Sequence, residues 1–132
     1  MKKFVILFLL LSITLPATAA EWVKIGNNLY LDKASVRYAP KNRTYKAWVK
    51  EIKPKETILY FNEYNLKEKE WRGLDKVTMD NKNNIKKREI PNHVGLNWFN
   101  VVPDTNSALE YEAVKKETQI PLKALEQELH ID

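Results

Sequence analysis

Two unlike kinds of side chain alternate along the centre of residues 44–52, TYKAWVKEI. One side of an extended chain there carries apolar side chains, those of Tyr45, Ala47 and Val49. The other side carries Lys46, Trp48 and Lys50. A period of two indicates a β-strand with two unlike faces. The stretch therefore predicts a sheet with one apolar face, and it leaves open what Trp48 contacts on the other.

Further segments have the β-branched and aromatic composition of strands, and turn residues separate them. They cover residues 21–32, 34–38, 57–66, 74–90 and 96–102. The first segment contains a tight turn around Gly26 and Asn28, because glycine and asparagine tolerate positive φ. The fourth segment is a hairpin around the turn sequence DNKNN. Together these segments predict an antiparallel meander of about five to six strands over residues 21–102.

The pattern changes after Pro103, where helix-forming residues replace the alternation. Asp104 and Thr105 both suit the N-cap of a helix. Its apolar stripe is expected to contain Leu109, Ala113 and Lys116. An interruption at residues 119–121 precedes a short second helix with an apolar seam of Leu122, Leu125 and Leu129. That seam packs either on the sheet or on another chain.

Strands followed by helices define an α+β domain. We expect an antiparallel sheet packed on one face by the C-terminal α-helix, with the helical segment spanning about 104–130. The opposite face then meets water or a second subunit. No repeat or long linker divides residues 20–132, so they are expected to form a single domain. The chain has no Cys, which excludes disulfides, thiol catalysis and cysteine-based metal sites.

The first nineteen residues have the layout of a secretory signal peptide. Lys2 and Lys3 precede a short apolar run, Pro16 breaks it, and small residues follow up to a cleavage point expected after Ala19. An uncleaved anchor is the alternative. We therefore expect an exported protein that works in the periplasm or at the cell surface.

The mature chain is only mildly basic. Loss of the two leader lysines lowers the formal net charge from +5 to about +3. Nucleic acid is a poor partner for an exported protein with so small a charge. Residues 41–55 are locally basic and could attract anionic polymers or membrane headgroups, but their lysines alternate along a hairpin and are better explained as a solvated surface.

Trp48, flanked by Lys46 and Lys50, is the candidate binding site for a partner. An aromatic ring between cations on a sheet face is suited to an acidic macromolecule or a polysaccharide. Two structural hypotheses compete with a binding role: the lysine stems cover the Trp48 ring, or this face of the sheet lies under the helix. We favour a structural role for Trp48.

No residue pattern indicates catalysis, a metal or a cofactor. His93 and His130 are far apart in the chain and have no carboxylate at ligand spacing. Asp32 and Ser35 have the spacing of a local turn, and no histidine lies nearby to activate the serine. We therefore expect a protein that is not an enzyme.

A set of short motifs resembles those of the surface-adhesin protein E-like family of small exported bacterial domains. The matching residues are Trp22, Tyr30, Asp32, Ser35, Val36 and Trp48, followed by Trp98, Pro103, Ser107 and Glu110. The resemblance covers about residues 22–114. The family usually has a pair of cysteines, one in the middle hairpin, where this chain has Asn81, and one at the C-terminus.

The resemblance implies a sheet backed by a helix, an envelope location and binding rather than catalysis. We therefore expect a binding module for an extracellular or envelope macromolecule. The alternative is a small periplasmic structural or accessory protein that acts by self-association, for example as a homodimer, or as part of an envelope complex.

Overall fold

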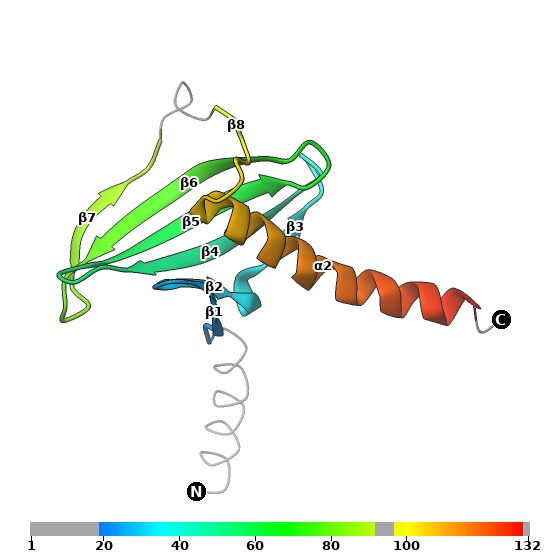
Figure 1. Cartoon of the computed structure of the whole chain (residues 1–132), viewed down its shortest axis with the longest axis horizontal. Coiled ribbons are helices and arrows are strands. Elements are labelled where there is room, and N and C mark those ends of the chain that lie inside the picture. The colour runs from blue at the N-terminus through cyan, green and yellow to red at the C-terminus, as the bar shows by residue number, and fades with distance from the viewer. Residues whose placement is uncertain (1–18, 92–96, 131–132) are drawn as a thin grey trace, which may run out of the picture.

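The structure, a computed structural model, describes residues 19–91 and 97–130, with side chains as far as Thr118 (Figure 1). Nearly all of the predicted signal peptide, the His93 loop and the Leu122, Leu125 and Leu129 side chains lie outside what is described. Within these residues eight strands form one antiparallel sheet: β1 (Trp22–Gly26), β2 (Leu29–Asp32), β3 (Arg37–Ala39), β4 (Thr44–Ile52), β5 (Thr57–Asn65), β6 (Glu70–Met79), β7 (Ile85–Glu89) and β8 (Phe99–Asn100). A short 3-10 helix, η2 (Lys33–Ser35), follows β2, and a long helix, α2 (Asn106–His130), ends the chain.

The strands are ordered β1-β2-β4-β5-β6-β7, so neighbours in sequence are mostly neighbours in space. Two short strands lie off this path, with β3 pairing to β4 and β8 pairing to β6. The α+β class and the antiparallel sheet are confirmed. The predicted count of five to six strands is too low, because the short strands β3 and β8, which lie in predicted extended segments, pair to β4 and β6 in addition to the six strands of the main path.

The alternation along β4 is confirmed. Ala47 and Val49 are fully buried and belong to the main hydrophobic cluster, together with Leu29, Leu31, Tyr64 and Val114. Because side chains alternate across a strand, Lys46, Trp48 and Lys50 lie on the opposite face of the sheet. Val114 belongs to α2, so the helix covers the Ala47 face and leaves the Trp48 face uncovered (Figure 1).

Helix α2 begins as predicted, with Thr105 and not Asp104 as its N-cap. The Thr105 hydroxyl accepts a hydrogen bond from the Ala108 N–H at 3.3 Å. The buried stripe differs from the predicted one: Glu110, Tyr111, Val114 and Thr118 are buried, whereas Leu109 is exposed. Two polar residues therefore occupy core positions, where a search for apolar spacing does not find them.

The predicted second helix is wrong, since α2 continues from Asn106 to His130 without a break at residues 119–121. Proline already has the φ angle of a helix, although it removes one backbone hydrogen bond and crowds the carbonyl four residues earlier; the strong helix formers beyond Pro121 offset this cost. The far half of α2 projects past the sheet (Figure 1). No helix in the described residues is long and apolar enough to span a membrane.

The turn between β1 and β2 uses its two expected residues differently. Asn28 takes the positive φ angle, +57°, whereas Gly26 does not. A Cβ atom on Gly26 would lie 2.7 Å from Leu109 Cδ1 of α2. A side chain at position 26 would therefore require the end of the Leu109 side chain to shift, whereas Asn28 provides the positive φ angle of the turn.

Candidate functional site

The uncovered face of the sheet contains a gap in strand pairing beside Trp48. Strand β2 pairs with residues 49–51 of β4 and β3 pairs with residues 44–46, so Ala47 and Trp48 face neither strand. The chain between β2 and β3 forms η2 at this point. The Ser35 hydroxyl replaces the missing ladder bond, since it accepts from the Trp48 N–H at 2.9 Å and donates to the Asp32 carbonyl at 2.7 Å.

Asp32 holds the same corner together. Its Oδ1 accepts from the Glu21 N–H at 2.7 Å and from the Ala34 N–H at 3.1 Å, which caps η2. The Lys33 N–H in turn donates to the Glu21 carbonyl at 2.9 Å. The expectation that Asp32 and Ser35 serve a local turn is confirmed, and these bonds also anchor the start of β1.

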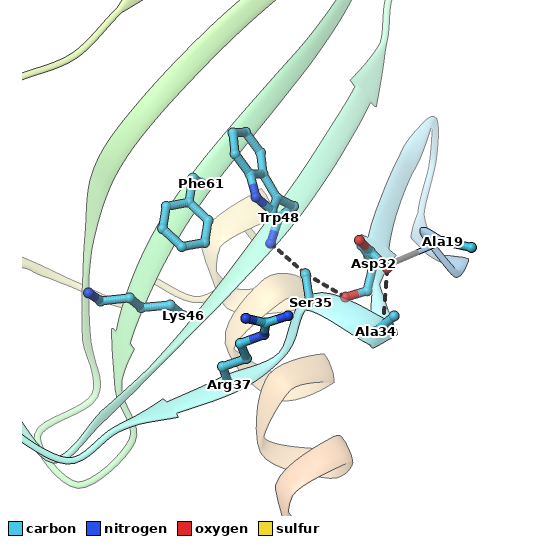
Figure 2. A pocket seen from close by; sticks show the side chains of 8 residues that line it. All are labelled: Ala19, Asp32, Ala34, Ser35, Arg37, Lys46, Trp48 and Phe61. Carbon is cyan, nitrogen blue, oxygen red and sulfur yellow. Dashed lines mark hydrogen bonds between the residues drawn. The ribbon is translucent and has the colours of Figure 1, made fainter. Parts of the chain in front are cut away.

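A pocket of about 420 Å³ opens at this gap (Figure 2). Trp48 and Phe61 form its aromatic wall, because they are cross-strand partners in β4 and β5, with ring centroids 5.0 Å apart. The opposite wall is formed by Ala19, Asp32, Ala34 and Ser35. The volume is in the range of pockets that hold small organic groups.

Two cations line the pocket and remain available. Arg37 and Lys46 are cross-strand partners in β3 and β4, and both contribute to the lining. Neither forms an ion pair or a side-chain hydrogen bond within residues 19–91 and 97–118. Figure 2 shows the Lys46 side chain extending away from the Trp48 ring, with its stem on the side of Phe61. The Lys46 ammonium therefore does not lie over the Trp48 ring. The hypothesis that the Trp48 face lies under the helix is wrong, because α2 packs on the Ala47 face.

Lys50 lies on the same face of β4 but contacts other rings. Its Nζ is 4.4 Å from the centroid of Trp22 and 5.3 Å from that of Tyr30, so it makes cation–π contacts with the first two strands. Of the three predicted site residues, the structure brings Lys46 and Trp48 together in the pocket and places Lys50 beside it.

Arg37 and Phe61 were not predicted as site residues. Arg37 lies just after a turn and Phe61 in a run of aromatic residues, and only the β3–β4 and β4–β5 registers place them beside Trp48. One signal could have found Phe61. If residues 44–52 and 57–66 are taken as the two strands of a hairpin, an aromatic residue lies opposite Trp48.

The pocket offers recognition groups and no reacting pair. The Ser35 hydroxyl is engaged on both sides by backbone groups, and Asp32 is held by backbone donors. In the part of the chain that the structure describes, no three acidic or histidine residues are grouped to hold a metal ion. Aromatic faces and free cations are instead the groups that bind an acid carried on a flat apolar body.

A second polar cluster lies under α2, on the other face of the sheet. Glu110 Oε1 accepts from the Tyr64 hydroxyl at 2.6 Å and from Asn62 Nδ2 at 2.9 Å, and all three side chains are buried. Burial, together with the charge of nearby Glu51, raises the pKa of the Glu110 carboxyl, although the two hydrogen bonds oppose this shift. The same burial and the Glu110 charge raise the pKa of Tyr64 well above its usual range. This cluster joins helix to sheet.

Glu110→Gln should make the protein more stable at neutral pH, and the gain should vanish in acid. The amide oxygen still accepts from Tyr64 and Asn62, while the cost of a buried charge disappears. Because the folded pKa is raised above the ordinary value of 4.5, the Glu110 contribution is complete below that pH and is lost as pH rises through the folded pKa. Urea unfolding of both proteins between about pH 4 and pH 8 measures this. A difference that does not change with pH contradicts it.

The chain matches no protein-family model, no curated protein and no solved structure. By its fold and its site the protein is an α+β domain in which a helix covers one face of the sheet and a pocket with aromatic and cationic side chains lies on the other face.

Proposed function

We propose that the protein is an exported, non-enzymatic binding module of the bacterial envelope that holds an acidic group of a macromolecule in the Trp48 pocket. One observation carries this proposal: a ring pair and two cations that have no partner among the described residues line the same pocket, on the face that α2 leaves uncovered. The layout of the first nineteen residues supports export, and the resemblance to the surface-adhesin protein E-like family points the same way.

An acidic polysaccharide fits the pocket better than an acidic peptide. A uronic acid unit joins a carboxylate directly to a compact ring with apolar C–H faces, so the ring can lie on Trp48 while the acid meets Arg37. The guanidinium is planar and matches a carboxylate with two parallel hydrogen bonds. In an acidic peptide the carboxylate is carried on a flexible stem with no flat face beside it. We therefore assign the pocket to a uronic acid unit of a polysaccharide.

Arg37→Ala and Trp48→Ala should each weaken binding of a galacturonic acid trisaccharide by at least about tenfold, which corresponds to about 1.4 kcal/mol. Arg37 is exposed and unpaired, so its loss should leave the unfolding transition unchanged. Titration calorimetry with the purified mature chain gives the affinities, and circular dichroism confirms the fold.

Phe99→Ala is the matched control, because Phe99 is an exposed aromatic residue that packs against Trp71 of β6 and does not line the pocket. It should bind the trisaccharide like the native chain. A neutral galactose trisaccharide should bind weakly to every form. Equal affinity of the native chain and Arg37→Ala, or preference for a glutamate-rich peptide over the trisaccharide, contradicts the assignment.

The alternative role, self-association, is tested on the same samples. Light scattering after size exclusion reports whether the mature chain is a monomer at micromolar concentration. A dimer that dissociates in Trp48→Ala and shows no saccharide binding would assign the uncovered face to a second copy and overturn the proposed function.

A further inference from the structure

The start of the mature chain lies at the wall of the pocket. Ala19, the last residue of the expected leader, lines it, and a peptide bond of about 1.33 Å joins Ala19 to Ala20. The next residue, Glu21, is held on both sides, by its N–H to Asp32 and by its carbonyl to Lys33. Neither bond involves a residue of the leader. Cleavage therefore leaves Glu21 in place, and with it the position of Ala20, the residue before it.

We infer that cleavage after Ala19 opens the pocket and adds a positive charge beside it, so that the processed chain binds its acidic ligand more tightly than the unprocessed chain. This inference rests on the proposed function and on export. In the cleavage, a leader peptidase adds water across the Ala19–Ala20 amide. The carbonyl carbon gains the hydroxyl and leaves with the leader as a carboxylate, and the Ala20 nitrogen keeps its electron pair and is protonated to an ammonium.

The new ammonium changes the charge of the pocket. Asp32 is the acid among the described lining residues, and it opposes the two cations Arg37 and Lys46. The ammonium forms one residue before the Glu21 N–H that Asp32 already holds at 2.7 Å, which is within reach of an ion pair. It therefore offsets the negative charge of Asp32, so that the lining attracts an acidic ligand more strongly. Departure of Ala19 also removes one side of the wall and widens the entrance.

Three chains test this inference with the galacturonic acid trisaccharide. The first begins at Ala20 with a free amine, the second is identical but acetylated on that amine, and the third retains Ala19 behind a short Gly–Ser lead. We expect the free-amine chain to bind at least about tenfold more tightly than either of the others. Matching unfolding curves for the three establish that the fold is the same.

The pH profile separates the ammonium from a steric effect. An α-amine ordinarily has a pKa near 8, and the ion pair with Asp32 raises that pKa, so affinity of the free-amine chain should fall as the pH rises above about 8. The charged residues near the ammonium are Asp32, Arg37, Lys46, Glu21 and Lys33. The acetylated chain has the same residues but no ammonium, so its affinity should not fall over this pH range. Equal affinity of the three chains, with binding still lost in Trp48→Ala, overturns the inference and leaves the proposed function standing. Absence of binding to all of them overturns the proposed function.

Discussion

Replacement of Glu63 by alanine is expected to lower the free energy of unfolding by about 3 to 5 kcal/mol. Glu63 lies on β5 with no exposed surface, and its carboxylate is surrounded by donors. Thr44 Oγ1 donates to Oε2 at 2.5 Å, Asn42 Nδ2 to the same oxygen at 3.2 Å, and Arg72 Nε to Oε1 at 2.7 Å. Loss of the carboxylate removes one strong acceptor from the partly buried Arg72 guanidinium and the acceptor of the buried Thr44 hydroxyl.

Denaturant unfolding at neutral pH measures the effect, with Arg88→Ala as the matched control. Arg88 forms an ion pair of the same length, 2.7 Å to Asp75, but the Arg88 side chain is exposed on strand β7, so its loss should cost much less than the loss of Glu63. A double-mutant cycle with Arg72→Met isolates the Glu63–Arg72 coupling. Similar losses for Glu63→Ala and Arg88→Ala would contradict the expectation.

The same network sets the response to acid. Burial acts to raise the pKa of Glu63, but hydrogen bonds from Thr44, Arg72 and Asn42 outweigh it and lower the pKa below 4.5. A lowered folded pKa gives a contribution that is present above the unfolded value and is lost as pH falls through the folded one. The two carboxyls therefore give stability opposite dependences on pH: the contribution of Glu63 is lost as the pH falls, and that of Glu110 is lost as the pH rises.

The buried carboxylates also show where sequence reasoning ends. The strand pattern of residues 44–52 predicts β4 correctly because its apolar side is continuous, and the helix N-cap at Thr105 follows from local chemistry. Glu63 and Glu110 carry charged side chains at core positions, so an apolar-spacing argument assigns them to the surface. Their partners come from distant parts of the chain, such as Asn42 for Glu63 and Asn62 for Glu110.

The pocket depends on information of the same kind. The sequence indicates that Trp48 and Lys46 share a face, since that follows from a period of two. It does not show that a 3-10 turn interrupts pairing beside Trp48, because that gap arises from the registers of β2 and β3 on β4. Nor does it bring Ala19 to the wall, which depends on the long-range bond between Glu21 and Asp32. Local periodicity predicts the faces of strands, whereas sites are built by register.

Tyr64→Ala is expected to cost about 3 to 5 kcal/mol, the range for deleting a fully buried aromatic side chain. Tyr64 is the largest side chain with no exposed surface, and it packs in the cluster that joins β2 and β4 to Val114 of α2. Its truncation leaves a cavity and also removes the hydroxyl that donates to Glu110 at 2.6 Å. Both losses fall on the contact between helix and sheet, so α2 should lose helical signal before the sheet unfolds.

Tyr64→Phe separates the two contributions. It keeps the ring and removes only the donor, so the loss should be smaller, about 1 to 3 kcal/mol, because Glu110 retains Asn62 as a partner. Tyr38→Ala is the matched control: Tyr38 is a tyrosine of the same sheet that is 52% exposed and stacks on Tyr45. Chemical denaturation monitored by circular dichroism ranks the three. If Tyr64→Ala is no more destabilising than Tyr38→Ala, the helix is not held to the sheet through Tyr64, and the closed face of the domain must owe its stability to other contacts.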